Sequence, residues 1–195
     1  MTNILFLDLD GPAFPEAVIC HDPDNRKPYP GKMDFGDLSY WKMCERIKNM
    51  WVHLYNVFDF EVVVSSTWRV HYPKPEYFYD LFNANGLPLN PHTDRCTPKI
   101  KSDRYSDFGP YGNSYGSNCK RASEIFNWLQ LHPEVKNYVI IDDPDSGYSL
   151  DVSGTVWNES HNSMAGNIVL ADSDSGLGSY QIRQMTAIMK RWPLV

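Results

Sequence analysis

The sequence has no long apolar run. Its longest apolar stretches, such as Ile4–Leu7 and Val139–Ile141, have the length of a strand, whereas a membrane-spanning helix needs about 20 apolar residues. The first residues, MTNILFLDLDG, also lack the basic stretch and the following apolar stretch of a secretory signal. We therefore expect a cytoplasmic protein with no membrane partner.

The sequence also has few cysteines and no excess of positive charge. The four cysteines lie far apart and form no Cys-x-x-Cys pair, so we expect reduced, structural thiols. The net charge is −6, which gives no support to a protein held on DNA by bulk positive charge. The six histidines show no His-x-x-x-His or His-Glu-x-x-His spacing, so the sequence predicts no zinc site.

The composition is that of one globular domain. Hydrophobic residues make up 42% and charged residues 22% of the 195 residues, and a chain of this length can bury a core without a disulfide or a metal. We expect a single domain over residues 1–195 with two polar, irregular, cap-like inserts at about 12–40 and 70–118. The second insert is rich in aromatic residues, which either stack on nucleobases or form a small core of their own.

Outside the inserts, apolar runs alternate with amphipathic segments. The pattern predicts strands over residues 3–10, 60–65, 138–141 and 167–171, and helices over 39–55, 118–131 and 179–192. Strands that alternate with helices indicate an α/β fold with a mostly parallel sheet flanked by helices.

Three of the predicted strands end in acidic or hydroxyl residues. Asp8 and Asp10 follow the first strand, Ser65 and Ser66 the second, and Asp142 with Asp143 the third. The carboxyl ends of parallel strands lie on one edge of a sheet, where ligands bind, so these side chains should meet there. Such a concentration of carboxylates needs a cation, and a set of oxygen ligands favours Mg²⁺.

Carboxylates, a hydroxyl group and a lysine around Mg²⁺ suit phosphoryl transfer. Lys120, at the start of its predicted helix, adds an ammonium group that can stabilise charge on phosphate oxygens. In this hypothesis Asp8 attacks phosphorus, while Asp10 protonates the leaving oxygen and later activates water.

Four segments together resemble a known family. ILFLDLDGP, VVVSSTWR, GSNCKRASEIFNWL and VIIDDPDSG are similar to the four motifs of the haloacid dehalogenase (HAD) superfamily of phosphatases. The resemblance implies a Rossmann-like sheet, a Mg²⁺ cofactor and an aspartyl-phosphate intermediate. It assigns roles in motif order: Asp8 as nucleophile, Asp10 as acid/base, Ser65 and Lys120 as phosphate-binding residues, Asp142 and Asp143 as metal ligands. Asp8 and Asp10 would also hold the metal, Asp10 through its backbone carbonyl.

Three details of the motifs stand apart. Ser66 is adjacent to Ser65 and is an alternative phosphate-binding hydroxyl, and Arg69 can add a bidentate phosphate contact. Pro12 stands where the family often has Thr or Val. The strings SSTWR and IVLADSDSGLG are also similar to the HAD-type domain of RNA-repair proteins.

The sequence thus predicts an enzyme, a HAD-type phosphoric monoester hydrolase. The substrate is expected to be a small phosphorylated molecule, a nucleotide or a nucleic-acid end, so that the protein would be a nucleotidase or an end-processing phosphatase. Two alternatives stay open: a phosphatase for sugar phosphates or other metabolites, and a non-catalytic module that binds a phosphorylated ligand. No protein partner is implied.

Overall fold

A computed structural model of the chain describes residues 2–14, 43–66, 76–87, 90–98, 114–143 and 164–193. In chain order its elements are β1 (Asn3–Leu7), α2 (Glu45–Val57), β2 (Glu61–Val64), α4 (Glu76–Ala84), β3 (Asn90–Cys96), α5 (Ser114–Leu131), β4 (Asn137–Asp142), the short 3-10 helix η3 (Ala165–Asn167), β5 (Ile168–Leu170) and α8 (Ser179–Met189). None of the described helices is long and apolar enough to cross a membrane.

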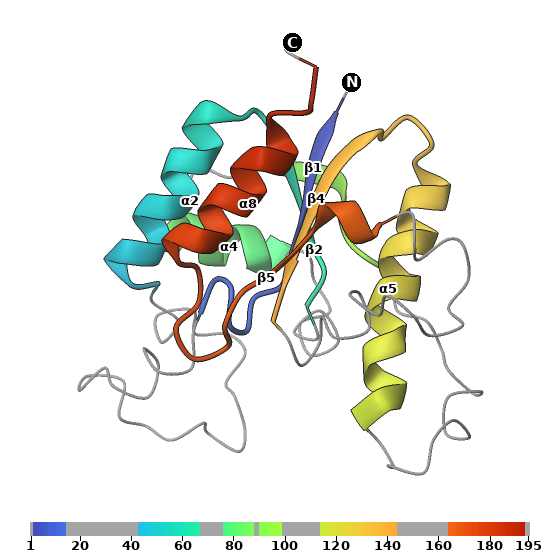
Figure 1. Cartoon of the computed structure of the whole chain (residues 1–195), viewed down its shortest axis with the longest axis horizontal. Coiled ribbons are helices and arrows are strands. Elements are labelled where there is room, and N and C mark those ends of the chain that lie inside the picture. The colour runs from blue at the N-terminus through green and yellow to red at the C-terminus, as the bar shows by residue number, and fades with distance from the viewer. Residues whose placement is uncertain are drawn as a thin grey trace.

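The five strands form one parallel sheet in the order β3-β2-β1-β4-β5. The first strand is central, with β2 on one side and β4 on the other (Figure 1). This confirms the predicted α/β fold with a Rossmann-like parallel sheet. It also brings the carboxyl ends of all described strands to one edge, as the sequence required.

Helices cover both faces of the sheet (Figure 1): α2, α4 and α8 lie on one side, and α5 lies on the other. Successive strand residues point to opposite faces. In β1, Leu5 and Leu7 therefore pack with the first group of helices, whereas Ile4 and Phe6 pack against α5. Because both faces are covered, the strand is apolar from Ile4 to Leu7, as its sequence indicated.

Part of the predicted insert at 70–118 belongs to the core of the domain. The expectation of irregular structure there is wrong for α4 and β3, since β3 pairs with β2 as an edge strand of the sheet. Its sequence, NPHTDRC, is polar and contains a proline. An edge strand tolerates both, because one side of its backbone has no partner strand in the described part of the chain. Two of the insert's aromatic residues, Phe78 and Tyr79, are buried in the core, so they are not a stacking surface.

The other predicted elements are present with shifted ends. The largest shifts are at the starts of two helices: α2 begins at Glu45 rather than at residue 39, and α5 begins at Ser114 rather than at residue 118. Most of the predicted insert at 12–40 lies outside the described residues.

Candidate active site

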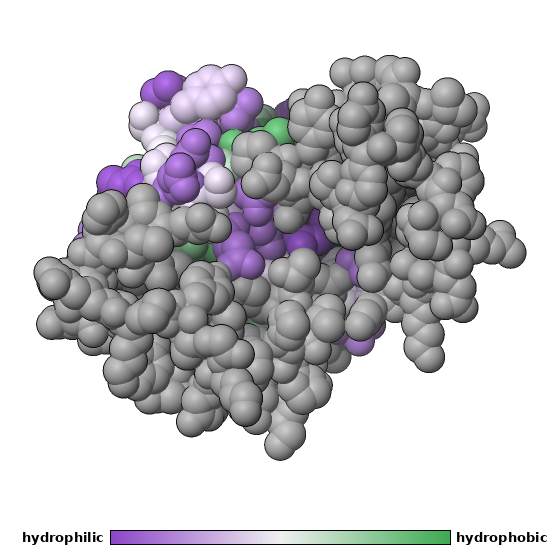
Figure 2. All heavy atoms as spheres, turned by 90° about the horizontal axis from the view of Figure 1, so that it is seen from below, coloured by the Kyte–Doolittle hydropathy of each residue, from purple (hydrophilic) through white to green (hydrophobic). Residues whose placement is uncertain are grey.

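The carboxyl edge of the sheet is held in register by backbone hydrogen bonds that continue past the strands. The amide of Asp8 donates to the carbonyl of Ile141 at 3.0 Å, and the amide of Ser65 donates to the carbonyl of Leu7 at 2.9 Å. These bonds place the residue after β1 beside the ends of both neighbouring strands. Figure 2, which views the molecule from this side, shows hydrophilic residues at the middle of the face.

Three of the predicted carboxylates meet at this edge. Asp8, Asp142 and Asp143 each offer an oxygen atom, and these atoms all lie within 4.8 Å of one another. All three residues are buried, with at most 6% of their surface exposed. The structure therefore brings two segments that are far apart in the sequence into one acidic cluster, here called the acid cluster.

A buried arginine, which the sequence analysis did not identify, contacts the acid cluster. Nη1 of Arg121, in α5, donates to Oδ1 of Asp8 at 3.2 Å and to Oδ2 of Asp142 at 3.0 Å. Arg121 is only 3% exposed. Its guanidinium group thus bridges the ends of β1 and β4 and neutralises part of the negative charge.

Burial strongly affects the protonation of this cluster. Burial raises the pKa of Asp8 well above its usual value, and the charge of Asp142 raises it further, against the lowering effect of Arg121. Burial also raises the pKa of Asp142 to about 6, although Arg121 lowers it. The charge of Arg121 thus offsets only part of the cost of ionising these carboxylates, and a further cation would stabilise their ionised forms.

A tight turn follows Asp8. The amide of Gly11 donates to the carbonyl of Phe14 at 3.1 Å, and Gly11 has a φ of 80°, a conformation that residues with a side chain rarely adopt. A Cβ atom at this position would lie 3.1 Å from Cα of Ser173 and 3.2 Å from Cβ of Asp143. Glycine therefore lets the turn lie directly against the acid cluster and against the loop that follows β5.

That loop is itself fixed by α2. Nη2 of Arg46 donates to the carbonyl of Ser175 at 2.6 Å, and Nη1 of the same residue donates to the carbonyl of Leu177. Inside the loop, Oδ1 of Asp172 accepts hydrogen bonds from the amides of Asp174 and Ser175. The segment SDSG after β5, singled out in the sequence, thus forms an ordered wall beside Gly11.

The second motif contributes two buried hydroxyl groups. Ser65 is 1% exposed and Ser66 is 0% exposed, and both follow β2. Oγ of Ser65 has no hydrogen-bond partner among the described residues, whereas Ser66 does interact with the protein. Because a buried hydroxyl group is usually satisfied, the unpaired Oγ of Ser65 fits a residue that awaits a ligand.

The remaining predicted site residues are less well defined. Asp10 lies close enough for its charge to raise the pKa of Asp8, but it is not in the acid cluster. The side chain of Lys120 and the whole of Arg69 lie outside the described residues. Their phosphate-binding roles stay predictions.

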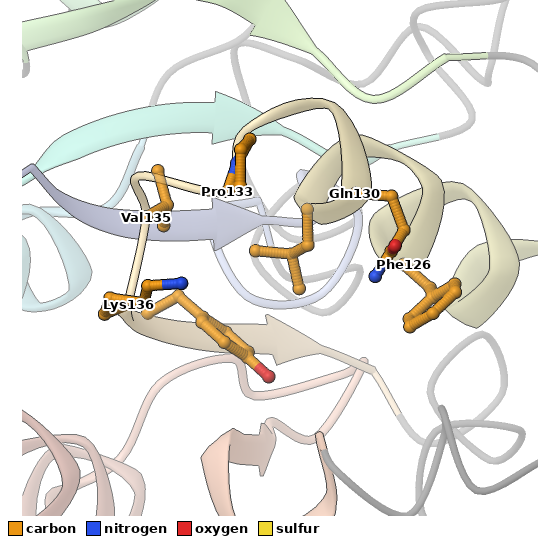
Figure 3. Close-up of a pocket in the computed structure, with 7 residues that line it drawn as sticks. Phe126, Gln130, Pro133, Val135 and Lys136 are labelled. Carbon is orange, nitrogen blue, oxygen red and sulfur yellow. The ribbon is translucent and has the colours of Figure 1, made fainter.

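A pocket of about 270 Å³ lies elsewhere, between the end of α5 and the start of β4 (Figure 3). It is lined by Phe126, Leu129, Gln130, Pro133, Val135, Lys136 and Tyr138. This lining contains no carboxylate, so the pocket lacks the chemistry that the acid cluster provides.

One family model matches this chain. It is described as the HAD domain in Swiss Army Knife RNA repair proteins, and it matches residues 4–182. The chain belongs to this HAD family. Searches of curated proteins and of solved structures found no match.

Membership in the HAD family implies a hydrolase that acts on small phosphorylated substrates and typically uses a divalent metal. The acid cluster fits such a metal. Its carboxylate oxygens are ligands of the kind that hard cations prefer, and a cation there would offset the cost of ionising Asp8 and Asp142. The observation that supports this fit is the donor set itself, three buried carboxylates whose oxygen atoms lie within 4.8 Å of one another.

Proposed function

We propose that the chain is a Mg²⁺-dependent phosphatase that hydrolyses the phosphate monoester of a nucleotide or a nucleic-acid end through an aspartyl-phosphate intermediate. The observation that carries the proposal is the position of Asp8. It lies at the end of the central strand, contacts Arg121 and shares the acid cluster with Asp142 and Asp143. The match to a domain of RNA repair proteins supports the choice of substrate.

In the proposed first step, Asp8 attacks phosphorus. Arg121 holds Oδ1 of Asp8, and we assign the attack to Oδ2. A bond forms between Oδ2 and phosphorus, the bond from phosphorus to the leaving oxygen breaks, and Asp10 gives its proton to that oxygen. The hydroxyl group of Ser65 and the ammonium group of Lys120 would hold the phosphoryl oxygens.

In the second step, Asp10 takes a proton from water. The resulting hydroxide attacks phosphorus, the bond to Asp8 breaks, and inorganic phosphate leaves, so that both aspartates return to their starting states. Asp8, Asp142 and Asp143, with the carbonyl of Asp10, would hold Mg²⁺, which supplies positive charge for the phosphoryl oxygens.

Replacement of Ser65 separates stability from activity. Ser65→Ala removes a buried hydroxyl group that has no partner among the described residues, so the free energy of unfolding should stay unchanged or rise by about 1 kcal/mol. If Oγ binds the substrate phosphate, kcat/KM should fall by about 10-fold to 100-fold, as for the loss of a hydrogen bond to a charged group. Chemical denaturation and phosphate-release assays measure the two effects.

Ser66→Ala is the matched variant for this prediction. Ser66 interacts with the protein, so its replacement should lower stability more than that of Ser65. Full activity in Ser65→Ala together with lost activity in Ser66→Ala would assign the phosphate-binding hydroxyl group to Ser66 instead.

The stabilisation by Mg²⁺ should depend on pH. The pKa of Asp142 is about 6 in the folded protein, above the ordinary value of a carboxyl group, so the folded state binds more protons than the unfolded state between these two values. The stability of the metal-free protein should therefore fall as the pH rises through this range, by up to about 1.4 kcal/mol per pH unit for this one group.

Mg²⁺ binds the ionised carboxylates, so the increase in Tm that it produces should be larger at about pH 7.5 than at about pH 5. Thermal melts with Mg²⁺ or with EDTA at both pH values test this. Equal increases at both pH values would show that the cation does not bind the acid cluster.

A substrate panel tests the proposed class. Terminally phosphorylated RNA and DNA oligonucleotides, the matching mononucleotides and a sugar phosphate are compared, each with Mg²⁺ and with EDTA. The proposal expects the highest kcat/KM for a nucleotide or an oligonucleotide end, and only with Mg²⁺. A preference for the sugar phosphate would favour a metabolite phosphatase, and tight binding without turnover would favour a non-catalytic module.

A further inference from the structure

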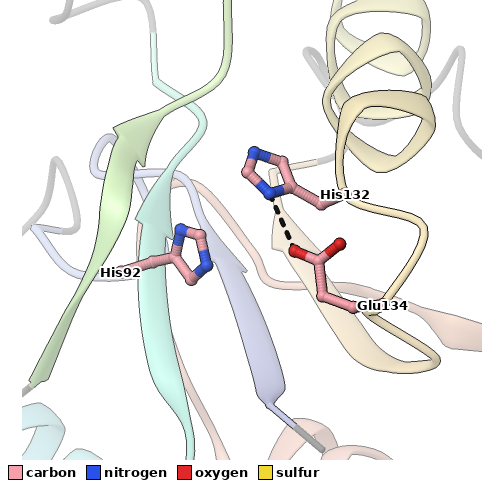
Figure 4. Close-up of side chains that lie close together, drawn as sticks. All are labelled: His92, His132 and Glu134. Atoms are coloured by element: carbon pink, nitrogen blue, oxygen red, sulfur yellow. Dashed lines mark hydrogen bonds and ion pairs between the residues drawn. The ribbon is translucent and has the colours of Figure 1, made fainter.

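A second cluster of potential metal ligands lies away from the acid cluster. His92 belongs to β3, His132 directly follows α5, and Glu134 lies two residues further on, before β4 begins. Each offers one nitrogen or oxygen atom, and these atoms all lie within 4.8 Å of one another. Figure 4 shows both rings and the carboxylate gathered in a common space between β3 and the end of α5.

The ring of His132 has a carboxylate beside each of its nitrogens. Nδ1 lies 3.0 Å from Oε1 of Glu134, and Nε2 lies 2.9 Å from Oδ2 of Asp94. Both ring nitrogens therefore face an oxygen ligand atom. With a metal ion bound between Nδ1 and Glu134, the ring proton is on Nε2 and faces Asp94.

A histidine that binds a metal through one ring nitrogen usually donates the N–H of its other ring nitrogen to a carboxylate. Here Asp94 would be that carboxylate. The buried Nε2 of His132 is close to Asp94 but is not aligned with it as in a hydrogen bond. The side chain of Asp94 is exposed, so a rotation of its carboxylate can complete the bond. Asp94 would thereby orient His132 without touching the metal.

An indole ring holds both imidazoles in place. Trp128 of α5 stacks on His132, with ring centroids 3.9 Å apart, and contacts His92 edge-on at 4.9 Å. Its Nε1 donates to the carbonyl of Asp94 at 3.2 Å. The two histidines are therefore fixed relative to each other before any ligand binds, which lowers the entropic cost of binding.

His92 requires one local change. In the structure the amide of Asp94 donates to Nδ1 of His92 at 3.0 Å, so the proton of the neutral ring is on Nε2. Binding of a metal by Nε2 moves that proton to Nδ1 and breaks the bond from Asp94. The change falls in the irregular stretch of the edge strand, where the pairing of β3 with β2 shifts register, so the released amide can turn to water.

We propose that His92, His132 and Glu134 form a Zn²⁺ site that ties β3 to the end of α5. Two imidazole nitrogens and one carboxylate suit Zn²⁺, with water as the fourth ligand, whereas Mg²⁺ prefers oxygen ligands. The exposed carboxylate of Glu134 leaves the site open to solvent. His92 lies far from His132 in the sequence, which is why the spacing of the histidines did not predict this site.

The site would be separate from the proposed Mg²⁺ site in position as well as in chemistry. His132 and Glu134 precede the first residue of β4, whereas Asp142 is its last. Zinc would anchor the carboxyl end of α5. Arg121, which contacts Asp8, lies nearer the start of the same helix.

Zinc titration of the whole chain tests the proposal. The protein is freed of metal with EDTA, dialysed into buffer with excess Mg²⁺ to occupy the acid cluster, and titrated with ZnCl₂ by calorimetry. Co²⁺ serves as a spectroscopic probe, because a tetrahedral site with imidazole ligands gives strong visible absorption. The wild type should bind about one Zn²⁺ at this site and gain thermal stability on binding.

The variants identify the ligands. His132→Gln and Glu134→Gln should each weaken Zn²⁺ binding at least about 10-fold and abolish the Co²⁺ bands. His53→Gln, at an exposed position of α2, should change neither. Since Glu134 is exposed, its replacement leaves the fold intact even if a histidine variant does not fold.

Two results would overturn the proposal: no saturable Zn²⁺ binding by the wild type, or unchanged binding by Glu134→Gln and His132→Gln. Both results are independent of phosphatase activity, so they leave the proposed function untouched.

Discussion

Asp8→Asn should reduce Mg²⁺-dependent phosphate release by at least about 10³-fold, because the amide cannot attack phosphorus. The substitution keeps the shape of the side chain and removes a charge whose burial is costly. The variant should therefore fold and be at least as stable as the wild type near neutral pH. Steady-state assays and thermal melts measure both effects.

Asp80→Asn is the matched control, because Asp80 is exposed on α4 and loses the same charge. It should retain wild-type activity and stability. Turnover by Asp8→Asn at more than a few per cent of the wild-type rate would exclude Asp8 as the nucleophile.

Arg121→Met should have the largest effect on stability. The substitution leaves Asp8 and Asp142 buried without the cation that contacts both, and loss of one partner from a buried ion pair costs about 3–5 kcal/mol. We expect a lower free energy of unfolding in EDTA, with partial recovery in Mg²⁺, because the metal replaces part of the lost positive charge. Denaturant unfolding under both conditions measures the loss.

The charge-matched control is Arg183→Met, at an exposed position of α8, which should change stability by less than about 0.5 kcal/mol. The double variant Asp8→Asn/Arg121→Met completes a thermodynamic cycle. Because the amide that replaces the carboxylate of Asp8 carries no charge, removal of Arg121 should cost less in this background. An equal cost in both backgrounds would show that Arg121 does not stabilise Asp8.

The strands that carry the acid cluster could be predicted because their signals are local. Each is an apolar run that ends in Asp, and the parallel arrangement brings those ends together. Strand β3 could not be predicted in this way, because its sequence contains Pro91, His92 and Asp94 and has no apolar pattern. Its structure depends on pairing with β2, which no local pattern encodes.

Arg121 was missed for a related reason. The sequence has Lys120 and Arg121 side by side, and only the rotational position of the helix decides which points inward. Ile125 and Trp128 are fully buried in α5, and Arg121 precedes them by four and seven residues, so it lies on the same helix face. A search for apolar periodicity finds only apolar residues and therefore misses a charged residue on a buried helix face. The spacing of Arg121 from Ile125 and Trp128 nevertheless indicates that it lies on that face.

A burst experiment tests the central claim, covalent catalysis by Asp8, most directly. Asp10→Asn is mixed with p-nitrophenyl phosphate and Mg²⁺; this leaving group needs no proton, so the first step proceeds while the second is slow. We predict a rapid release of about one p-nitrophenolate per chain and a phosphoryl group on Asp8 in the acid-quenched peptide. Absence of the burst, or a phosphoryl group on another residue, would contradict the account.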